Sequence, residues 1–76
     1  MNRPLKIVLA GDYKQFQDWL KEKAENFEDF DARQYRYADS PEDINGLIIE
    51  GVVTIGTWYE RDANHELLKI AQTRII

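Results

Sequence analysis

Two short runs, "IVLA" at residues 7–10 and "VVTI" at residues 52–55, constrain the fold of this 76-residue chain more than any other feature. The first is continuously apolar and the second is rich in β-branched residues, a pattern typical of strands buried on both faces of a parallel sheet. We predict one strand over residues 5–10, ended by Gly11. A second is predicted over residues 52–55, with Gly51 as the turn that leads into it.

Two segments have the pattern of amphipathic helices. The first is "DYKQFQDWLKEKAENF", residues 12–27, with Asp12 as its predicted N-cap and Gln15 at the capping-box spacing. Its apolar face is predicted to comprise Tyr13, Phe16, Leu20, Ala24 and Phe27. The second covers residues 62–76 with Asp62 as its predicted cap. Its apolar stripe is predicted to comprise Leu67, Leu68, Ala71 and Ile75, widened by Ile70.

Residues 33–38, "RQYRYA", alternate between two faces, with Tyr35 and Tyr37 on the same one. Alternation of this kind favours an edge strand with one solvated face. A short helical turn should follow and end near Gly46, because Ser40 is a good cap and Pro41 occupies the first helical position.

The element order is therefore strand, helix, strand, short helix, strand, helix. Such alternation predicts an α/β fold with a three-stranded parallel sheet, helices on both faces and right-handed crossovers. Because the second strand is the amphipathic one, we place it at an edge, in the order 2-1-3. This arrangement is Rossmann/flavodoxin-like. The chain, residues 1–76, is short enough that we expect a single domain.

Composition excludes several classes of function. The net charge of −4 argues against general nucleic-acid binding, which depends on Lys and Arg contacts to phosphate. The chain has no cysteine, hence no disulfide or thiolate site, and its one histidine, His65, has no metal-ligand partners at suitable spacing. Its apolar runs are far shorter than the roughly 20 residues of a membrane span. We expect a cytoplasmic protein with no membrane segment, metal or cofactor.

In open parallel sheets, ligands bind beyond the carboxyl ends of the strands, where the strand order reverses. A nucleotide or small anion bound there would contact residues of the first and third strand ends, namely Gly11, Asp12, Tyr13, Gly56 and Thr57. However, "AGDYKQF" matches neither the dinucleotide-binding fingerprint nor a P-loop, and Asp12 would compete with an anion for the helix amides. Helix caps and turns are the ordinary roles of these residue types, so this hypothesis is the alternative one.

A catalytic site would have to use carboxylates at the same strand ends: Asp12, Asp39, Glu60 and Asp62. Three of the four have plausible capping or turn roles, and so small a chain has little with which to enclose a substrate. We therefore predict that the protein is not an enzyme.

Protein recognition is the preferred hypothesis, because Trp, Tyr and Arg dominate the energetics of interfaces. The predicted contact residues are Trp58, Tyr59, Arg61 and Tyr37. Tyr13 and a partly exposed Trp19 would add to them, unless the aromatic side chains only seal a small core. The protein would be a monomer or a homodimer, with the edge of the third strand able to pair two copies.

The carboxylates of "FEDFD" and "DSPED" offer a further reading, in which they imitate a phosphate row and occupy a nucleic-acid-binding site. Solvated loops and helix caps are the commoner role of such clusters, and basic residues interrupt this one.

The segments "KIVLAGDYKQFQDWL", "YRYADSPEDINGL" and "VVTIGTWYER" together resemble small Rossmann-like proteins encoded by tailed bacteriophages. The resemblance covers most of the chain and implies an accessory protein that binds a host factor of the infected bacterium. "IVLAG" and "IGTWYE" are also distantly similar to strand-end motifs of nucleoside deoxyribosyltransferase-like proteins, in which Glu60 would match a late glutamate. This chain has about half the length of such enzymes, so the similarity implies a fold rather than an activity.

Overall fold

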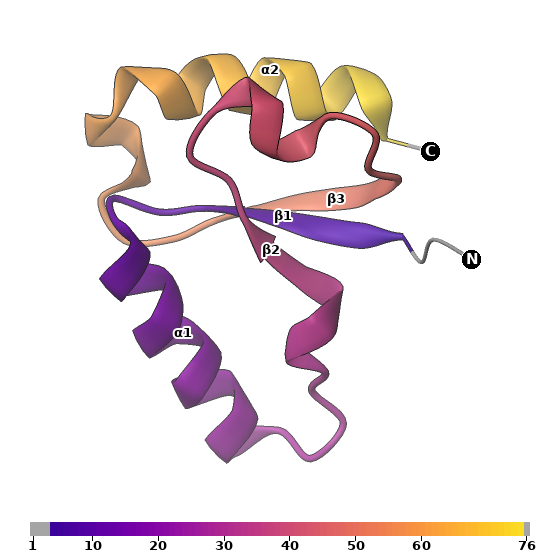
Figure 1. Cartoon of the computed structure of the whole chain (residues 1–76). Helices are drawn as coiled ribbons and strands as arrows, with labels where there is room; N and C mark the ends of the chain where they lie inside the picture. Colours follow the sequence, from indigo (N-terminus) through magenta and orange to yellow (C-terminus); the bar gives the residue numbers. More distant parts are fainter. Residues whose placement is uncertain (1–3, 76) are drawn as a thin grey trace.

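The computed structural model describes residues 4–75 and shows a parallel sheet between two layers of helices (Figure 1). The strands and α-helices are β1 (Leu5–Leu9), α1 (Tyr13–Asn26), β2 (Tyr35–Tyr37), β3 (Ile49–Thr54) and α2 (Asp62–Arg74). Three 3-10 turns connect them: η1 (Ala32–Gln34), η2 (Pro41–Ile44) and η3 (Trp58–Glu60). The sheet has the order β2-β1-β3 with parallel pairing throughout, so the predicted α/β class and strand order are confirmed.

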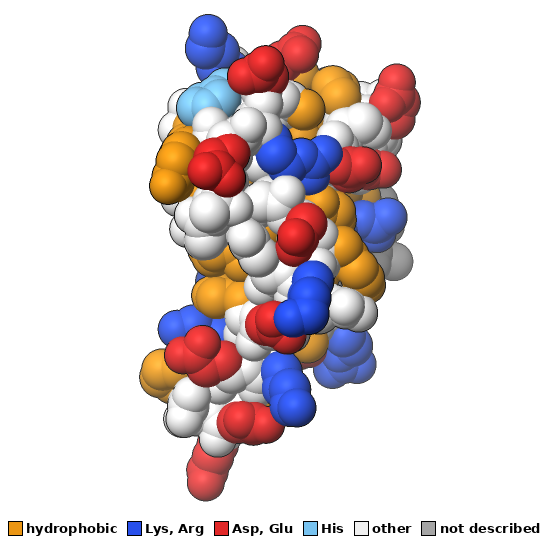
Figure 2. Space-filling model, turned by 90° about the vertical axis from the view of Figure 1, so that its left-hand side faces the viewer, with side chains coloured by type: hydrophobic (Ala, Val, Ile, Leu, Met, Phe, Trp, Pro, Cys, Tyr) orange, Lys and Arg blue, Asp and Glu red, His pale blue; other side chains and the backbone are white. Residues whose placement is uncertain are grey.

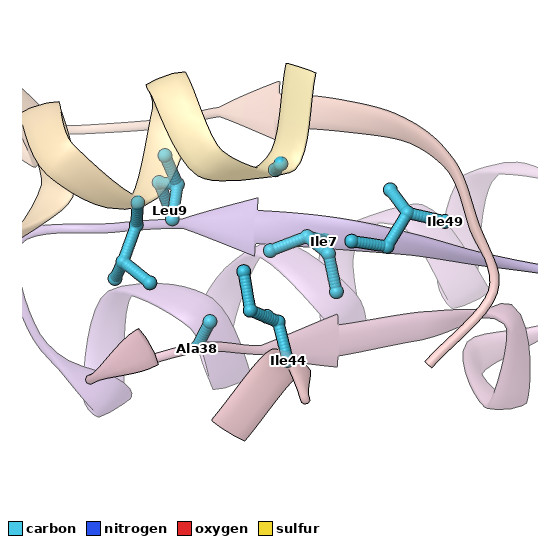
Figure 3. Close-up of a cluster of buried hydrophobic side chains, with 7 residues drawn as sticks. Ile7, Leu9, Ala38, Ile44 and Ile49 are labelled. Carbon is cyan, nitrogen blue, oxygen red and sulfur yellow. The ribbon is translucent and has the colours of Figure 1, made fainter. Parts of the chain in front are cut away.

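The main core lies between the sheet and the layer formed by α2 and η2. Ile7 and Leu9 point from β1 into this layer, since side chains alternate along a strand. The fully buried members are Ile7, Leu9, Ala38, Ile44, Ile49, Leu67 and Ala71 (Figure 3). Each of the larger aliphatic side chains contributes about 1.5–3 kcal/mol by leaving water, so this cluster is the main source of stability.

A smaller core lies on the opposite face of the sheet, beneath α1. Val8, Ala10 and Phe16 are buried there, and half-buried aromatic and aliphatic side chains surround them. Helix α1 leaves the sheet at a steep angle (Figure 1), so only its first half covers the sheet. Consequently Ala24 and Phe27 are exposed, and the predicted apolar face is wrong for the second half of the helix. Tyr13, at its start, is also 54% exposed.

Strand β3 is longer than the sequence indicated. It begins at Ile49 and passes through Gly51, which pairs with Lys6 of β1, so the prediction of a turn at Gly51 is wrong. A glycine interrupts the apolar pattern without breaking the strand, because its backbone stays extended and paired. A Cβ at position 51 would meet no atom within 4 Å, so the space over this residue is open.

The ends of two other elements also differ from the prediction. Of the predicted strand over residues 33–38, residues 33 and 34 belong to η1 and Ala38 lies beyond the strand, so β2 has three residues. Arg61 rather than Asp62 is the N-cap of α2, so the predicted cap is wrong by one position. Ile75 lies beyond the end of α2, where it is 39% exposed and forms a parallel bridge with Ile49.

Candidate functional site

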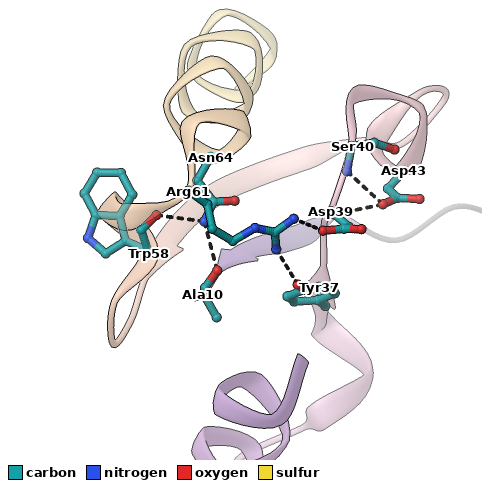
Figure 4. Close-up of polar contacts among 8 residues, drawn as sticks. All are labelled: Ala10, Tyr37, Asp39, Ser40, Asp43, Trp58, Arg61 and Asn64. Atoms are coloured by element: carbon teal, nitrogen blue, oxygen red, sulfur yellow. Dashed lines mark hydrogen bonds and ion pairs between the residues drawn. The ribbon is translucent and has the colours of Figure 1, made fainter. Parts of the chain in front are cut away.

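Three segments follow the carboxyl ends of the strands and contact one another through side chains. We call residues 10–13, 38–40 and 55–61 the strand-end rim. Figure 4 shows part of it, with Arg61 reaching from the β3–α2 segment to the residues that follow β2. All the residues predicted for either binding hypothesis lie in the rim, except Tyr37, which immediately precedes it.

The side chain of Gln15 fills the crevice between the ends of β1 and β3. Its Oε1 atom accepts hydrogen bonds from Gly11 N at 2.9 Å and from Thr57 N at 3.2 Å. Its Nε2 atom donates to Thr57 Oγ1 at 2.9 Å, and its backbone N–H donates to Asp12 Oδ1 at 2.8 Å. The crevice that open sheets use for ligands is therefore occupied by a side chain of the protein itself.

The two glycines of this crevice accommodate the same side chains. A Cβ on Gly11 would overlap Thr57 Oγ1, and a Cβ on Gly56 would overlap Gln15 Oε1. Gly56 also has a φ of +56°, a conformation that side chains disfavour. The glycines are thus needed for close approach between protein segments, whether or not a ligand binds.

Arg61 connects the two outer strand ends. Its Nη1 atom donates to the Tyr37 hydroxyl at 2.7 Å, and its Nη2 atom donates to Asp39 Oδ1 (Figure 4). The hydrogen bond that Arg61 donates to Asp39 raises the pKa of Arg61 further above its ordinary value, so the guanidinium stays charged. Because both of its Nη atoms donate inside the molecule and only 29% of its side chain is exposed, Arg61 stabilises the rim more than it offers a contact.

Asn64, in α2, is a buried residue next to the rim that the sequence analysis did not identify. It is fully buried in the first turn of α2, and its Nδ2 atom donates to Ala10 O and Trp58 O, each at 2.9 Å (Figure 4). Its Oδ1 atom has no hydrogen-bond partner among residues 4–75, so Nδ2 makes both of the hydrogen bonds of this side chain within that range. One signal was present: Asn64 precedes Leu67 and Ala71 at the i, i+3, i+7 spacing of a buried stripe.

Trp58 and Tyr59, two of the predicted contact residues, differ in how far their side chains are buried. Trp58 is half-buried and packs against the core beneath α2. Tyr59 is 57% exposed, while its carbonyl oxygen lies 2.9 Å from His65 Nε2. The ring of His65 in turn lies 5.2 Å from that of Trp58. Tyr59 therefore projects from a rigid support.

A second exposed tyrosine lies on the other side of the crevice. Tyr13 contacts Tyr37 edge-on, with ring centroids 5.3 Å apart, and Phe16 with centroids 5.9 Å apart. Tyr37 is half-buried, because its ring also lies against Phe16 and its hydroxyl binds Arg61. Tyr13 and Tyr59 are thus the large apolar side chains that the rim exposes most.

Carboxylates dominate the charge of the rim and its immediate neighbourhood. Four of them are exposed: Asp12, Asp39, Glu60 and Asp62. Figure 2 views the molecule from this side and shows hydrophobic side chains reaching the surface in separate places among charged ones. Asp12 caps α1 and Asp39 binds Arg61, so two of the four already have structural partners. Within residues 4–75, no cluster of three or more histidine, aspartate or glutamate side chains is suited to a metal ion.

An open cavity of about 330 Å³ lies away from the crevice, beside β2. Its walls comprise Leu5, Tyr13, Phe16, Tyr35, Tyr37, Arg33 and Arg36. Arg33 is held by Asp31 through its backbone N–H and two guanidinium nitrogens. Of the residues predicted for a small ligand, Tyr13 lines this cavity, whereas Gly11, Asp12, Gly56 and Thr57 do not.

Fold and rim together define a small α/β protein with a Rossmann-like sheet whose strand-end crevice is closed by its own side chains. Comparison of the chain with protein-family models, with curated proteins and with solved structures found no match. In the described part of the chain, neither helix has the length and apolar character required to span a bilayer.

Proposed function

We propose that this protein binds another protein through the strand-end rim. The observation that carries the proposal is the exposure of Tyr13 and Tyr59, at 54% and 57%, beside a crevice that is already filled. Of the residues predicted from sequence, Tyr59 makes direct contact with the partner, while Trp58 and Tyr37 support the exposed rings. Arg61 holds the rim together.

Tyrosines of this kind are effective contact residues. A buried aromatic side chain covers 150–250 Å², and tyrosine is enriched among residues that dominate binding energy. Tyr13 is supported by Phe16 and Tyr37, and the backbone of Tyr59 is held by His65. Because the supporting groups are fixed before binding, little conformational entropy is lost when a partner arrives.

The charge of the rim indicates a partner with a basic surface. Asp12, Glu60 and Asp62 are exposed, and the neighbouring Lys14 is paired with Asp18 at 3.5 Å. Carboxylates around an aromatic contact accelerate association with a positively charged partner and disfavour acidic ones. The resemblance to phage proteins makes a basic protein of a bacterial host the first class of partner to search.

The alternative function, binding of a nucleotide or small anion at Gly11, Asp12, Tyr13, Gly56 and Thr57, has less support. The backbone donors of Gly11 and Thr57 are used by Gln15, and the carboxylate of Asp12 caps the helix. Titration of ¹⁵N-labelled protein with nucleotides and with inorganic phosphate tests this directly. Saturable shifts of the Gly11 and Thr57 amides would support the alternative.

A comparison of three proteins tests the preferred function. Tagged wild-type protein, the double variant Tyr13→Ala with Tyr59→Ala, and the control Phe27→Ala are each used to capture proteins from a bacterial lysate. Phe27 is 56% exposed but lies at the far end of α1, so its removal costs a similar aromatic surface outside the rim. We expect a basic protein to be captured by wild type and control and to be lost with the double variant.

Direct binding of the purified partner then provides the quantitative test. Loss of two central tyrosines should weaken the affinity by at least tenfold, since such residues commonly cost more than 1 kcal/mol each. Equal affinity of wild type and the double variant for the purified partner would contradict the proposal. So would a partner that Phe27→Ala loses as well.

A further inference from the structure

We infer that the open edge of β3 pairs with the same edge of a second copy of this chain. The pairing is antiparallel about a two-fold axis and produces a six-stranded sheet in the order 2-1-3-3-1-2. This surface adjoins the strand-end rim only at Ile55 and involves neither Tyr13 nor Tyr59, so the inference does not depend on the function proposed above.

The two edges of the sheet differ in how they are protected. Strand β2 has only three residues, includes the exposed Arg36 and follows Arg33 of η1. Strand β3 has six residues, includes no Lys, Arg or Pro, and has Glu50 as its one charge. Natural edge strands that must stay unpaired are usually short, charged or interrupted by proline. By this criterion the β2 edge is protected and the β3 edge is available for pairing.

The hydrogen bonds to β1 determine which backbone groups of β3 face outward. Ile55 N donates to Leu9 O at 2.9 Å, so position 55 faces β1. In a parallel ladder, alternate residues present their N–H and C=O groups to the same neighbour, so Val53 also faces β1. Val52 and Thr54 therefore present their N–H and C=O groups to the open edge.

The start of β3 limits the possible register. Ile75 forms a bridge with Ile49, so the chain that follows α2 already occupies this end of the edge. A second strand can extend along the edge from Glu50 onward. A two-fold axis at Val53 satisfies this limit and pairs Val52 with Thr54 of the second copy, so that each exchanges both backbone hydrogen bonds.

Side chains are complementary in this register. Val53 lies opposite Val53 of the second copy, and Gly51 lies opposite Ile55 of the second copy. The space over Gly51 is empty within 4 Å of where a Cβ would lie, so it can receive the larger side chain. Each Glu50 lies three positions from the axis, which separates the two carboxylates by about 20 Å along the strands. The same sequence thus supplies both halves of the interface without a like-charge contact.

Pairing would also cover apolar surface that the monomer leaves half-exposed. Val53 and Ile55 lie on the face of the sheet from which α1 diverges, and Val52 lies on the α2 face. In the second copy, Thr54 lies opposite Val52, Val53 opposite Val53 and Gly51 opposite Ile55. The pairing therefore buries apolar surface that a small domain with limited burial needs to cover.

A single introduced cysteine tests the register. The chain contains no cysteine, so Val53→Cys creates one thiol per copy. Opposite residues at a non-hydrogen-bonded site have Cα atoms about 4.5 Å apart, which is within the range of a disulfide. On mild oxidation, in which two thiols lose two electrons and two protons to the added oxidant, we expect a covalent dimer on a non-reducing gel. The control Gln17→Cys, on the exposed side of α1, should remain largely monomeric under the same conditions.

A second pair of variants tests the edge itself. The N–H of Thr54 faces outward, so Thr54→Pro removes an interface donor while leaving the Ile55 to Leu9 hydrogen bond intact. In analytical ultracentrifugation, wild type and the control Thr54→Val should sediment at twice the 9.0 kDa of the chain. Thr54→Pro should sediment as a monomer with unchanged circular dichroism.

Three results would overturn the inference: a monomeric wild type at the highest soluble concentration, cross-linking of Val53→Cys no faster than of Gln17→Cys, or a folded Thr54→Pro that remains dimeric. If Thr54→Pro fails to fold, the cysteine comparison decides. The double variant Tyr13→Ala with Tyr59→Ala should remain dimeric, which separates this inference from the proposed function of the rim.

Discussion

Gln15 and Thr57, which are 42 positions apart in the sequence, are joined by two hydrogen bonds between the first turn of α1 and the end of β3. Oε1 of Gln15 accepts from Thr57 N at 3.2 Å, and Nε2 donates to Thr57 Oγ1 at 2.9 Å. Since the same Oε1 also accepts from Gly11 N, this one carboxamide joins the segments that follow β1 and β3. The contact is half-buried, so water competes for it only in part.

Replacement of this side chain should therefore be costly. Gln15→Ala leaves the N–H groups of Gly11 and Thr57 without their protein acceptor. We expect the free energy of unfolding to fall by about 1–3 kcal/mol, the usual cost of a lost partner for buried polar groups. Urea unfolding followed by tryptophan fluorescence measures it. The matched control is Gln17→Ala, an exposed glutamine on the same helix, and equal losses from the two variants would show that the crevice contact contributes nothing.

Two glycines with positive φ provide a comparison of backbone strain with steric overlap. Gly46 has a φ of +77° and open space around its Cβ position, whereas at Gly56 a Cβ would overlap Gln15. Gly46→Ala should cost about 1–2 kcal/mol of stability for the left-handed conformation alone. Gly56→Ala should cost more, because it also displaces the carboxamide of Gln15.

A double-mutant cycle checks this explanation. In a Gln15→Ala background the overlap is gone, so the cost of Gly56→Ala should fall to that of Gly46→Ala. Urea unfolding of the variants gives each value. An unchanged cost of Gly56→Ala in that background would mean that the clash with Gln15 is not the cause.

The sequence predicted the elements of this fold where the signals are local. The apolar runs identified β1 and the second half of β3, and Asp12 caps α1 as its spacing indicated. The order β2-β1-β3 followed from the difference between buried and amphipathic strands. Gly51 was misinterpreted because a glycine inside a strand and a glycine that ends one look alike until the pairing of their neighbours is known.

The rim could be predicted in position but not in structure. Topology brings the strand ends together, yet nothing in the sequence shows that Gln15 fills the crevice or that Arg61 reaches Tyr37. Contacts of this kind depend on the angle of a helix and the path of a loop, which propensities do not determine. For the same reason the sequence left open whether Trp58 faces the core, and the structure shows that it packs there.

The turn after β2 should give the protein a pH-dependent stability. The carboxylate of Asp43 accepts backbone hydrogen bonds from Asp39 N at 2.8 Å and Ser40 N at 3.1 Å. These bonds hold the pKa of Asp43 below its ordinary value of 3.8. A pKa that is lower in the folded than in the unfolded state contributes stability above the unfolded value. That contribution is lost as the pH falls through the folded value.

Asp43→Asn should therefore lower the urea midpoint at neutral pH and reduce the additional loss of stability on acidification below pH 3.8. Urea titrations at neutral pH and in acid measure both effects. Glu42→Gln, which removes the neighbouring exposed carboxylate, is the control and should change the neutral midpoint less. An acid response of Asp43→Asn identical to that of wild type would contradict the role assigned to these two hydrogen bonds.

Asn64 allows a sharper test of the rim, because its buried Nδ2 donates to two carbonyl oxygens, Ala10 O and Trp58 O. Asn64→Ala should cost about 1–3 kcal/mol by leaving both carbonyls without a donor. Asn64→Asp has nearly the same shape but places a carboxylate against them. At neutral pH it should cost about 3–5 kcal/mol, as expected for an uncompensated buried charge.

Acidification should reduce the difference in the free energy of unfolding between Asn64→Ala and Asn64→Asp. Burial beside carbonyl oxygens raises the pKa of the new carboxyl group in the folded state, so the folded protein binds the proton more tightly than the unfolded one. The stability of Asn64→Asp, relative to Asn64→Ala, should therefore increase as the pH falls through that raised value. Once protonated, the carboxyl group can donate to one of the two carbonyls. Urea unfolding of both variants across the acidic range measures the gap, and a gap that stays constant with pH would show that position 64 is solvated rather than buried between β1 and η3.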